Sequence, residues 1–341
     1  MLKRLGSEIP QEADQLLPNG RRNPLHEDCL AFSNGRAALA WLLKRKVEYR
    51  SALVCAYTCP ALVKFLRGQG LQVGLYDVSA SGEQMEQARQ HLETPCMVLT
   101  QALFGELPSW WWGVIRRGDL SLIDASHTAF AHLDVPDSWV LSSPRKTTGV
   151  HDGAILRLPI GAVKYRSEIN KLPVAVQAIT WKMLAHRYWC EGSDDLANAM
   201  RRCGENDMPE TPHRMSAESL WALERMDVGW HTHKRKHNYE RLARRLLVRE
   251  LPLELQSDLV PSHCSIIVSN PDKLVAHLKA QRIYATRLWP DAEHDPALHP
   301  RAHLFTQHLV ALPCDQRCDD ADIDRIAKAV LEAAKPMGSP R

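Results

Sequence analysis

The feature that most constrains the fold is an alternation of short β-rich runs with helical runs between residues 28 and 158. The predicted strands are Ser51–Tyr57, Leu71–Val78, Cys96–Leu103, Leu120–Ser126, Ser138–Ser143 and Gly153–Leu158. Apolar residues at helical spacing predict helices from Arg36 onward, over Pro60–Gly70 and over Gly82–Glu93. Because strands that alternate with helices indicate βαβ units, we predict an α/β fold with a mostly parallel sheet.

The second half of the chain predicts a run of helices followed by a smaller α/β unit. Residues 170–238 have helical patterning, and Glu218–Leu247 is predicted to be one long helix that leads into the smaller unit. The elements predicted there are the strands His263–Asn270 and His308–Cys314 and the helices Asp272–Ile283, capped by Asp272, and Asp319–Ala334. We therefore predict a large domain over residues 1–235 and a small C-terminal domain over residues 236–341.

The composition excludes several classes of partner and site. The 341 residues carry a net charge of only +3, and the basic residues are dispersed, so no nucleic-acid partner is indicated. The nine cysteines are odd in number and include no C-x-x-C pair, which argues against a disulfide framework and a zinc site, so no metal is predicted. The first residues lack the apolar core of a signal peptide, and no run of about eighteen apolar residues occurs. We expect a cytoplasmic protein that does not enter a membrane.

Polar residues gather where the predicted strands end. They are Thr58, Asp124, His127, Ser142, Ser143 and Lys146. Ligands of open parallel sheets bind outside the carboxyl ends of the strands. Lys146 follows two serines that leave an apolar strand, and it precedes a turn that contains glycine. A lysine in that place can be an ordinary surface residue, but a partly desolvated one loses its proton near neutral pH and can form a Schiff base with an aldehyde.

Three further features have both a structural and a functional interpretation. Asp124 ends an apolar strand and is either a helix cap or salt-bridge partner, or the partner of a protonated pyridine nitrogen. His127 is either structural or a contact of such a ring. The segment Ser33–Leu39 places backbone amides at a helix N-terminus, which attracts phosphate, although Arg36 could simply be exposed.

Eight segments, taken together, resemble the DegT/DnrJ/EryC1/StrS aminotransferase family, a branch of the fold-type I pyridoxal phosphate enzymes. In chain order they are SNGRAAL (33–39), CAYTCPALVKFLRGQGLQVGLYDV (55–78), LFGELP (103–108), LIDASHTAFA (122–131), SSPRKTTGVHDGAIL (142–156), HRMSAESLWALERMD (213–227), HNYERLARRL (237–246) and ALPCDQRCDDADIDRIAKAV (311–330). Each segment is short, but their common order along nearly the whole chain makes the resemblance specific.

The resemblance implies an α/β, fold-type I PLP-dependent transferase with pyridoxal 5'-phosphate attached to Lys146. Lys146 would also shuttle a proton, and Asp124 would pair with the pyridine nitrogen. The other implied cofactor contacts are His127 at the ring oxygen, Gly35, Arg36 and Ser142 or Ser143 at the phosphate, and Tyr57, Thr58 or Cys59 near the ring face.

The implied reaction is transamination by a homodimer. An amino acid, with glutamate as the favoured donor, would supply nitrogen to a keto group. A nucleotide-linked sugar of polysaccharide biosynthesis is the favoured acceptor. The donor and acceptor classes come from the resemblance and not from the residues themselves.

Three positions depart from the family pattern. Cys59 stands where an aromatic residue often stacks on the ring, and Leu141 stands where a serine is common. Thr211 and Pro212 stand where the family often has an Asn that reaches the partner subunit, so Arg214 or a nearby polar group is predicted to reach the partner's phosphate instead. These departures leave open another pyridoxal phosphate reaction on a non-sugar substrate, or a non-catalytic regulatory protein that binds the cofactor.

Three other motifs carry weaker hypotheses. His231, His233 and His237 are either zinc ligands or, as we favour, part of an exposed basic helix. The polar run Trp289–His303 is predicted to be a loop at the substrate entrance, with Arg287 as an anion contact. The run Trp110–Trp112 is either a helix face packed on a dimer partner or a sugar-stacking surface, and we favour packing, since a monomer would struggle to cover this apolar cluster.

Overall fold

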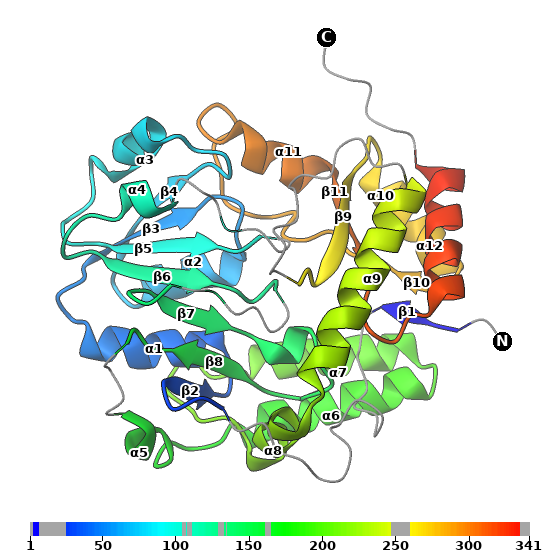
Figure 1. The fold of residues 1–341 in the computed structure, drawn as a ribbon, viewed down its shortest axis with the longest axis horizontal. Helices are drawn as coiled ribbons and strands as arrows, with labels where there is room; N and C mark the ends of the chain where they lie inside the picture. The colour runs from blue at the N-terminus through cyan, green and yellow to red at the C-terminus, as the bar shows by residue number, and fades with distance from the viewer. Residues whose placement is uncertain are drawn as a thin grey trace.

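The computed structural model describes residues 3–6, 25–103, 107, 111–128, 133, 135–160, 165–246 and 260–334. Its central feature is a seven-stranded sheet with the order β2-β8-β7-β6-β5-β3-β4 (Figure 1). The strands are β2 (Cys29–Phe32), β3 (Ser51–Cys55), β4 (Gln72–Tyr76), β5 (Met97–Gln101), β6 (Leu120–Asp124), β7 (Trp139–Ser142) and β8 (Ala154–Arg157). The run from β7 to β4 is parallel, and β8 is antiparallel to both of its neighbours. The predicted α/β fold with a mostly parallel sheet is confirmed.

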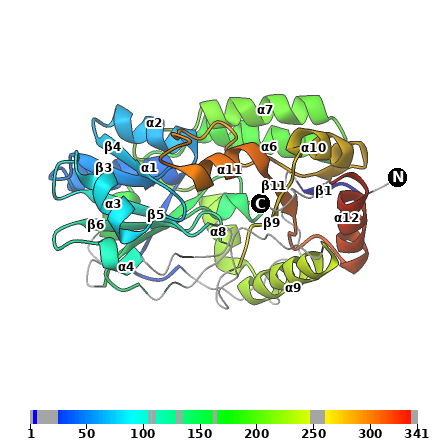
Figure 2. The same cartoon turned by 90° about the horizontal axis from the view of Figure 1, so that it is seen from above.

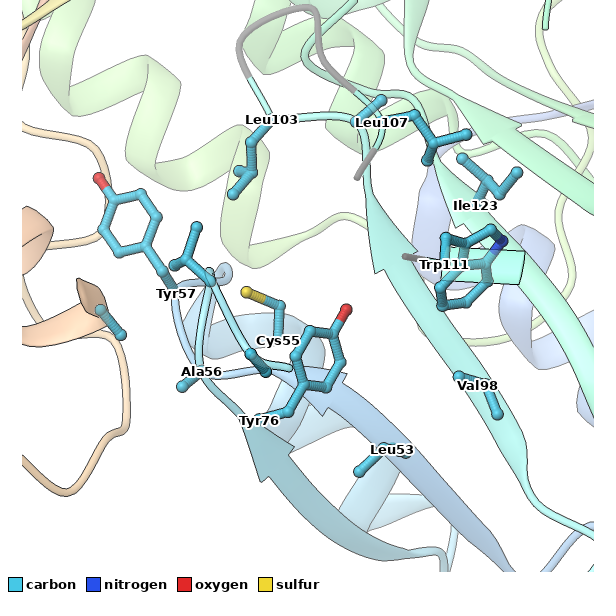
Figure 3. Close-up of a cluster of buried hydrophobic side chains, with 14 of the residues drawn as sticks. Leu53, Cys55, Ala56, Tyr57, Tyr76, Val98, Leu103, Leu107, Trp111 and Ile123 are labelled. Atoms are coloured by element: carbon cyan, nitrogen blue, oxygen red, sulfur yellow. The ribbon is translucent and has the colours of Figure 1, made fainter. Parts of the chain in front are cut away.

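Helices cover both faces of the large sheet. Successive side chains of a strand point to opposite faces, so strands that are buried throughout, such as β3 and β5, are covered on both faces. One face packs against α1 (Gly35–Arg45) and α2 (Pro60–Gly68). The other face packs against α3 (Gly82–Arg89) and α4 (Trp111–Val114). In Figure 2 these two helices lie on the opposite side of the sheet from α1 and α2. The core on the α3 side includes Tyr76, Val98 and Trp111, and Tyr57 lies at its margin (Figure 3).

A second core lies beside the ends of the parallel strands. Its strands form two small sheets, in which β9 (His263–Ile267) is antiparallel to β11 (Leu309–Pro313), and β1 (Leu5–Gly6) is parallel to β10 (Ile283–Tyr284). The helices α9 (Val228–Leu246), α10 (Pro271–Ala280) and α12 (Asp320–Ala333) pack on these sheets. Since Leu5 is buried in this core, the N-terminal strand packs with the C-terminal part of the chain. The domain division at residue 235 stays a proposal.

The remaining helices in the described part of the chain are α5 (Arg166–Ile169), α6 (Val176–Cys190), α7 (Asp194–Asn206), α8 (Ala217–Arg225) and α11 (Pro300–His308). The helices α6 and α7 pack against each other as a pair (Figure 1). In the described part of the chain, no helix combines the length and apolar character that crossing a bilayer requires.

Three of the predicted helix boundaries are wrong. The predicted helix Glu218–Leu247 is divided into α8 and α9, because Met226 has an extended backbone and the Asp227 carboxylate accepts the backbone N–H of Trp230 to begin α9. The predicted cap Asp272 lies in the first turn of α10, whose N-cap is Asn270. The predicted loop Trp289–His303 ends in helix, because α11 begins at Pro300.

Buried Asp77 explains the start of α11. Its carboxylate oxygens accept the backbone N–H groups of Arg301 at 3.0 Å and of Ala302 at 2.8 Å. The first N–H groups of a helix have no partner within the helix, so a carboxylate from another segment stabilises that end. Asp77 follows β4 and is distant from Ala302 in the sequence, so the run Trp289–His303 alone does not reveal this interaction.

Candidate active site

A cavity of about 390 Å³ opens beside the ends of β6 and β7. Part of its lining comes from turns that follow the strands, and part comes from α6, α7 and the segment before β9. The lining includes Cys59, His127, Arg145, Lys146, Lys182, Arg201, Glu205, Ser262, His263, Leu288 and Trp289. The cavity therefore lies where the sequence predicted a ligand, outside the carboxyl ends of the parallel strands.

Lys146 lies on a single 3-10 turn, Pro144–Lys146, that follows β7. Its backbone N–H donates to the Ser143 carbonyl at 3.0 Å, and its side chain opens into the cavity. Desolvation of the Lys146 amine by the surrounding groups lowers its pKa, the charge of Asp124 opposes this shift, and the charge of Arg145 adds to it. The amine therefore loses its proton more readily than an ordinary lysine does, as nucleophilic attack requires.

Asp124 ends β6, His127 follows it, and both belong to the surroundings of Lys146. The Asp124 carboxylate accepts the backbone N–H of Ser126 at 2.9 Å, and its charge acts on Lys146. His127 is buried, and its Nε2 lies 3.4 Å from the Lys146 Nζ. Burial, followed by the charge of Lys146, lowers the pKa of His127 well below its usual range, so the ring is neutral at neutral pH. Its Nδ1 has no hydrogen-bond partner among the described residues.

The residues that follow β3 have three different environments. Cys59 lines the cavity at the start of α2. Thr58 is buried, and its hydroxyl accepts the Gln101 side-chain N–H. The Tyr57 hydroxyl donates to the Leu288 carbonyl at 2.7 Å, and its ring packs on Trp289 and Phe305. Tyr57 thus holds the cavity-lining Leu288–Trp289 segment against the large sheet and does not itself line the cavity.

Gln101 is a buried polar residue at a strand end that the sequence reasoning missed. It ends β5, it is buried, and its backbone pairs in register with Asp124. Its side-chain oxygen has no partner among the described residues. The signal was present in the sequence, because Gln101 is a polar residue near the end of an apolar predicted strand, as Asp124 is.

The predicted phosphate residues do not line this cavity. Gly35 lies in the first turn of α1, and Arg36 donates to the Glu210 carboxylate at 3.0 Å and to the Glu205 carbonyl at 3.4 Å. Ser142 ends β7, and the Ser143 hydroxyl donates to the Gly153 carbonyl at 3.3 Å. The role of these four residues at a phosphate stays a prediction.

A second feature that the sequence reasoning missed is a charged cluster on the helical part of the lining. Glu205 of α7 forms ion pairs with Arg145, at 3.0 Å, and with Lys182 of α6. Burial alone would raise the pKa of Glu205, but Arg145 and Lys182 lower it to about 2. Since Arg201 also lines the cavity, this part of the lining has more positive than negative charge. Such a surface favours an anionic ligand.

The other predicted contacts lie elsewhere. Arg287 donates to the Asp272 carboxylate and to the Thr306 carbonyl, and its role as an anion contact at the entrance stays a prediction. Arg214 donates to the Leu172 carbonyl at 3.1 Å and does not line the cavity. Trp111 is fully buried, as the packing interpretation predicts, whereas Trp110 and the Trp112 side chain lie outside the described residues.

The predicted exposed basic helix is only partly correct. His231 and Arg235 are buried, with 0% and 1% of their surface exposed, whereas His233 and His237 lie at or near the surface. The helical spacing of the basic residues therefore did not reveal that His231 and Arg235 lie on the inward face of α9. No group of three or more His, Cys, Asp or Glu side chains that could hold a metal occurs within the ranges that the structure describes.

Known proteins share the fold. No family model matches the sequence, and no curated sequence matches it. Spr1654 from Streptococcus pneumoniae, in its PLP form, has a TM-score of 0.66 at 12% identity, over 96% of this chain and 97% of that chain. A DegT DnrJ EryC1 StrS aminotransferase from Brucella abortus has a TM-score of 0.62 at 16% identity, over 89% of this chain and 85% of that chain. DesI, in the presence of its TDP-sugar product, has a TM-score of 0.59 at 14% identity, over 94% and 93%.

These structural similarities span nearly the whole of both chains, while the identities are low. They show that this chain has the fold of pyridoxal phosphate-dependent aminotransferases of the DegT/DnrJ/EryC1/StrS type. The fold implied by the sequence resemblance is thereby confirmed. A shared fold does not by itself determine the reaction, which depends on the side chains at the site.

Proposed function

We propose that this chain is a pyridoxal phosphate-dependent aminotransferase that moves an amino group from an amino acid, with glutamate as the favoured donor, to a keto group. The observation that carries the proposal is Lys146, whose side chain opens into the cavity with a lowered pKa beside Asp124 and His127. That arrangement occurs at the strand ends of a fold shared with a solved aminotransferase.

The residues around the cavity fit pyridoxal phosphate. Lys146 supplies the amine for covalent attachment, and Asp124 supplies a carboxylate for a protonated pyridine nitrogen. The unpartnered Nδ1 of buried His127 suits a contact with a polar group of the ligand. The cations Arg145, Lys182 and Arg201 suit a phosphate. A volume of about 390 Å³ lies within the range of small-molecule sites.

Each residue would have a separate task in the reaction. When bound, the cofactor carries the amino group between substrates and stabilises negative charge on the carbon next to nitrogen. Lys146 would hold the cofactor covalently and move the substrate proton at its Nζ. Asp124 would keep the pyridine nitrogen protonated. Neutral His127 would orient the Lys146 amine without adding a competing positive charge.

We propose a nucleotide-linked sugar as the acceptor. One observation supports this choice: DesI, which shares the fold, was solved in the presence of its TDP-sugar product. Cys59, which lines the cavity where the family often has a stacking aromatic residue, favours the alternative of a pyridoxal phosphate reaction on a non-sugar substrate.

The proposal includes a cytoplasmic homodimer. All nine cysteines are free, as in a reducing compartment. An isologous dimer is the commonest assembly of such enzymes, and sedimentation of cofactor-loaded protein at micromolar concentration tests it. A loaded monomer would contradict the dimer and would favour the non-catalytic alternative.

Borohydride labelling tests the cofactor and its site together. The purified protein should absorb near the visible edge of the ultraviolet, and reduction should fix a pyridoxyl group on Lys146, as peptide mass spectrometry would show. Lys182 is the built-in control, because it is also a lysine of the cavity lining and is ion-paired to Glu205. Label on Lys182, or none on loaded protein, would refute attachment at Lys146.

A further inference from the structure

Arg235 is a charged residue of α9 that is buried beside the proposed site. Only 1% of its surface is exposed, and burial lowers its pKa, while the charge of Asp315 opposes that shift. A buried guanidinium without a close carboxylate is costly unless hydrogen bonds compensate it. The interactions of Arg235 therefore indicate why the chain places a cation here.

The guanidinium of Arg235 donates to two backbone carbonyls from different segments. One bond, of 2.8 Å, reaches the carbonyl of Thr147, and the other, of 3.1 Å, reaches the carbonyl of Ser262. Both bonds are buried. The rigid, planar fork of arginine can hold two acceptors at a fixed separation, which the single ammonium group of lysine does less well.

Both carbonyls belong to segments that touch the proposed catalytic groups. Thr147 directly follows Lys146 in the sequence. The backbone N–H of Ser262 donates to the His127 carbonyl at 3.1 Å, and Pro261 pairs with Thr128. Arg235 thus joins the turn after β7, which carries Lys146, to the turn after β6, which carries His127. Figure 1 shows α9 on the side of the large sheet where these strands end.

A second bond from the C-terminal part reinforces this arrangement. The Gln316 side chain donates to the same Thr147 carbonyl at 3.4 Å. Gln316 lies just after β11 and is buried next to Asp315. Among the described residues, the Thr147 carbonyl is therefore held by α9 and by the segment after β11.

We propose that Arg235 is a positioning residue, which sets the separation of the Lys146 Nζ and the His127 ring by holding the Thr147 and Ser262 carbonyls together. The inference rests on the proposed function, in which Lys146 holds the cofactor. Within the described residues, Arg235 has no hydrogen bond to either of these side chains and acts through the backbone of the two turns.

Arg241 provides a matched control on the same helix. It is also an arginine of α9, but it pairs with Asp320 and Asp324 of α12 and makes no bond to the turns of the site. The experiment compares Arg235→Met, Arg235→Lys and Arg241→Met as full-length proteins. The measurements are amide hydrogen exchange, kcat and KM with the best available donor, and the thermal midpoint.

Arg235→Met should raise hydrogen exchange in residues 145–150 and 126–128 by at least about ten-fold, because each lost bond to a charged group shifts the local opening equilibrium by about that factor. It should lower kcat by a similar factor with little change in KM. Arg235→Lys should recover part of both losses. Arg241→Met should leave both unchanged, even if the thermal midpoint falls.

The proposal would be overturned if hydrogen exchange in these two turns were unchanged in Arg235→Met. It would also be overturned if Arg241→Met raised the exchange there equally. If Arg235→Met does not fold, Arg235→Gln, which is neutral and can serve one carbonyl, replaces it with the same criteria. The failure of the proposed function is a separate result. If hydrogen exchange rises in Arg235→Met but Lys146 of the wild type takes no borohydride label, the proposed enzyme function is contradicted. Arg235 would then have only a structural role in holding the two turns.

Discussion

The two parts of the cavity lining differ in origin and in charge. The part from the strand ends holds one amine with a lowered pKa beside a neutral histidine, so it suits covalent chemistry. The part from α6 and α7 holds Lys182, Arg201 and Glu205, with Arg145 paired to it, so it suits an anion. The comparison teaches that reactivity and anion binding are built from different structural elements of this chain, which allows each to be changed separately.

The largest effect should come from the strand-end part. Asp124→Asn should still bind cofactor and accept borohydride label at Lys146, because the amine and the cations remain. The rate of the amino-donor half-reaction should fall by about a thousand-fold or more, or about 4 kcal/mol of barrier, because an amide cannot hold the pyridine nitrogen protonated. Single-turnover absorbance measures this rate. A near-normal rate in labelled protein would remove Asp124 from the mechanism.

An intermediate effect should come from the boundary between the two parts. Arg145→Gln should weaken cofactor binding about ten- to hundred-fold, because it removes a charged donor that lines the cavity. Arg36→Gln is the matched variant, since Arg36 contacts the same helix, at the Glu205 carbonyl, but does not line the cavity. Its effect should be less than about three-fold. Titration of apoprotein with pyridoxal phosphate measures both.

The reverse order of these two effects would be informative. A strong effect of Arg36→Gln with a weak effect of Arg145→Gln would place the phosphate at the N-terminus of α1, as the resemblance to the family implies. It would also mean that α1 and the cavity form one binding site in the loaded protein. The two variants therefore decide between the sequence-based and the structure-based position of the phosphate.

The strand-end part was largely predictable from the sequence, because apolar runs specify the strands and the residue after each run lies at the carboxyl edge. Lys146, His127 and Cys59 reach the cavity in this way. Gln101 was missed only because it was treated as part of its strand. The mostly parallel character of the sheet followed from the same alternation of strands and helices, whereas the order of the strands within the sheet was not predicted.

The helical part could not be predicted from spacing alone. Lys182 and Glu205 lie in helices whose polar residues resemble a solvated surface until α6 and α7 pack together. Arg235 shows the same limit, because a basic helix predicts exposure while its tertiary contacts bury it. The break between α8 and α9 also depended on a local cap, at Asp227, that a continuous helical pattern concealed.

The smallest effect should come from the acid of the helical part. The folded pKa of Glu205, about 2, lies below its unfolded value of 4.5, so its charge stabilises the fold above pH 4.5 and loses this contribution as the pH falls toward 2. Glu205→Gln should therefore be less stable than the wild type at pH 7, by less than about 1 kcal/mol, because solvent screens the partly exposed carboxylate. The difference in the free energy of unfolding should shrink between pH 4.5 and pH 2.

Urea unfolding of both proteins at several pH values measures this difference. The control is Glu210→Gln, which removes an exposed ion pair with Arg36. A difference that grows as the pH falls would show that Glu205 is not held as a carboxylate by Arg145 and Lys182.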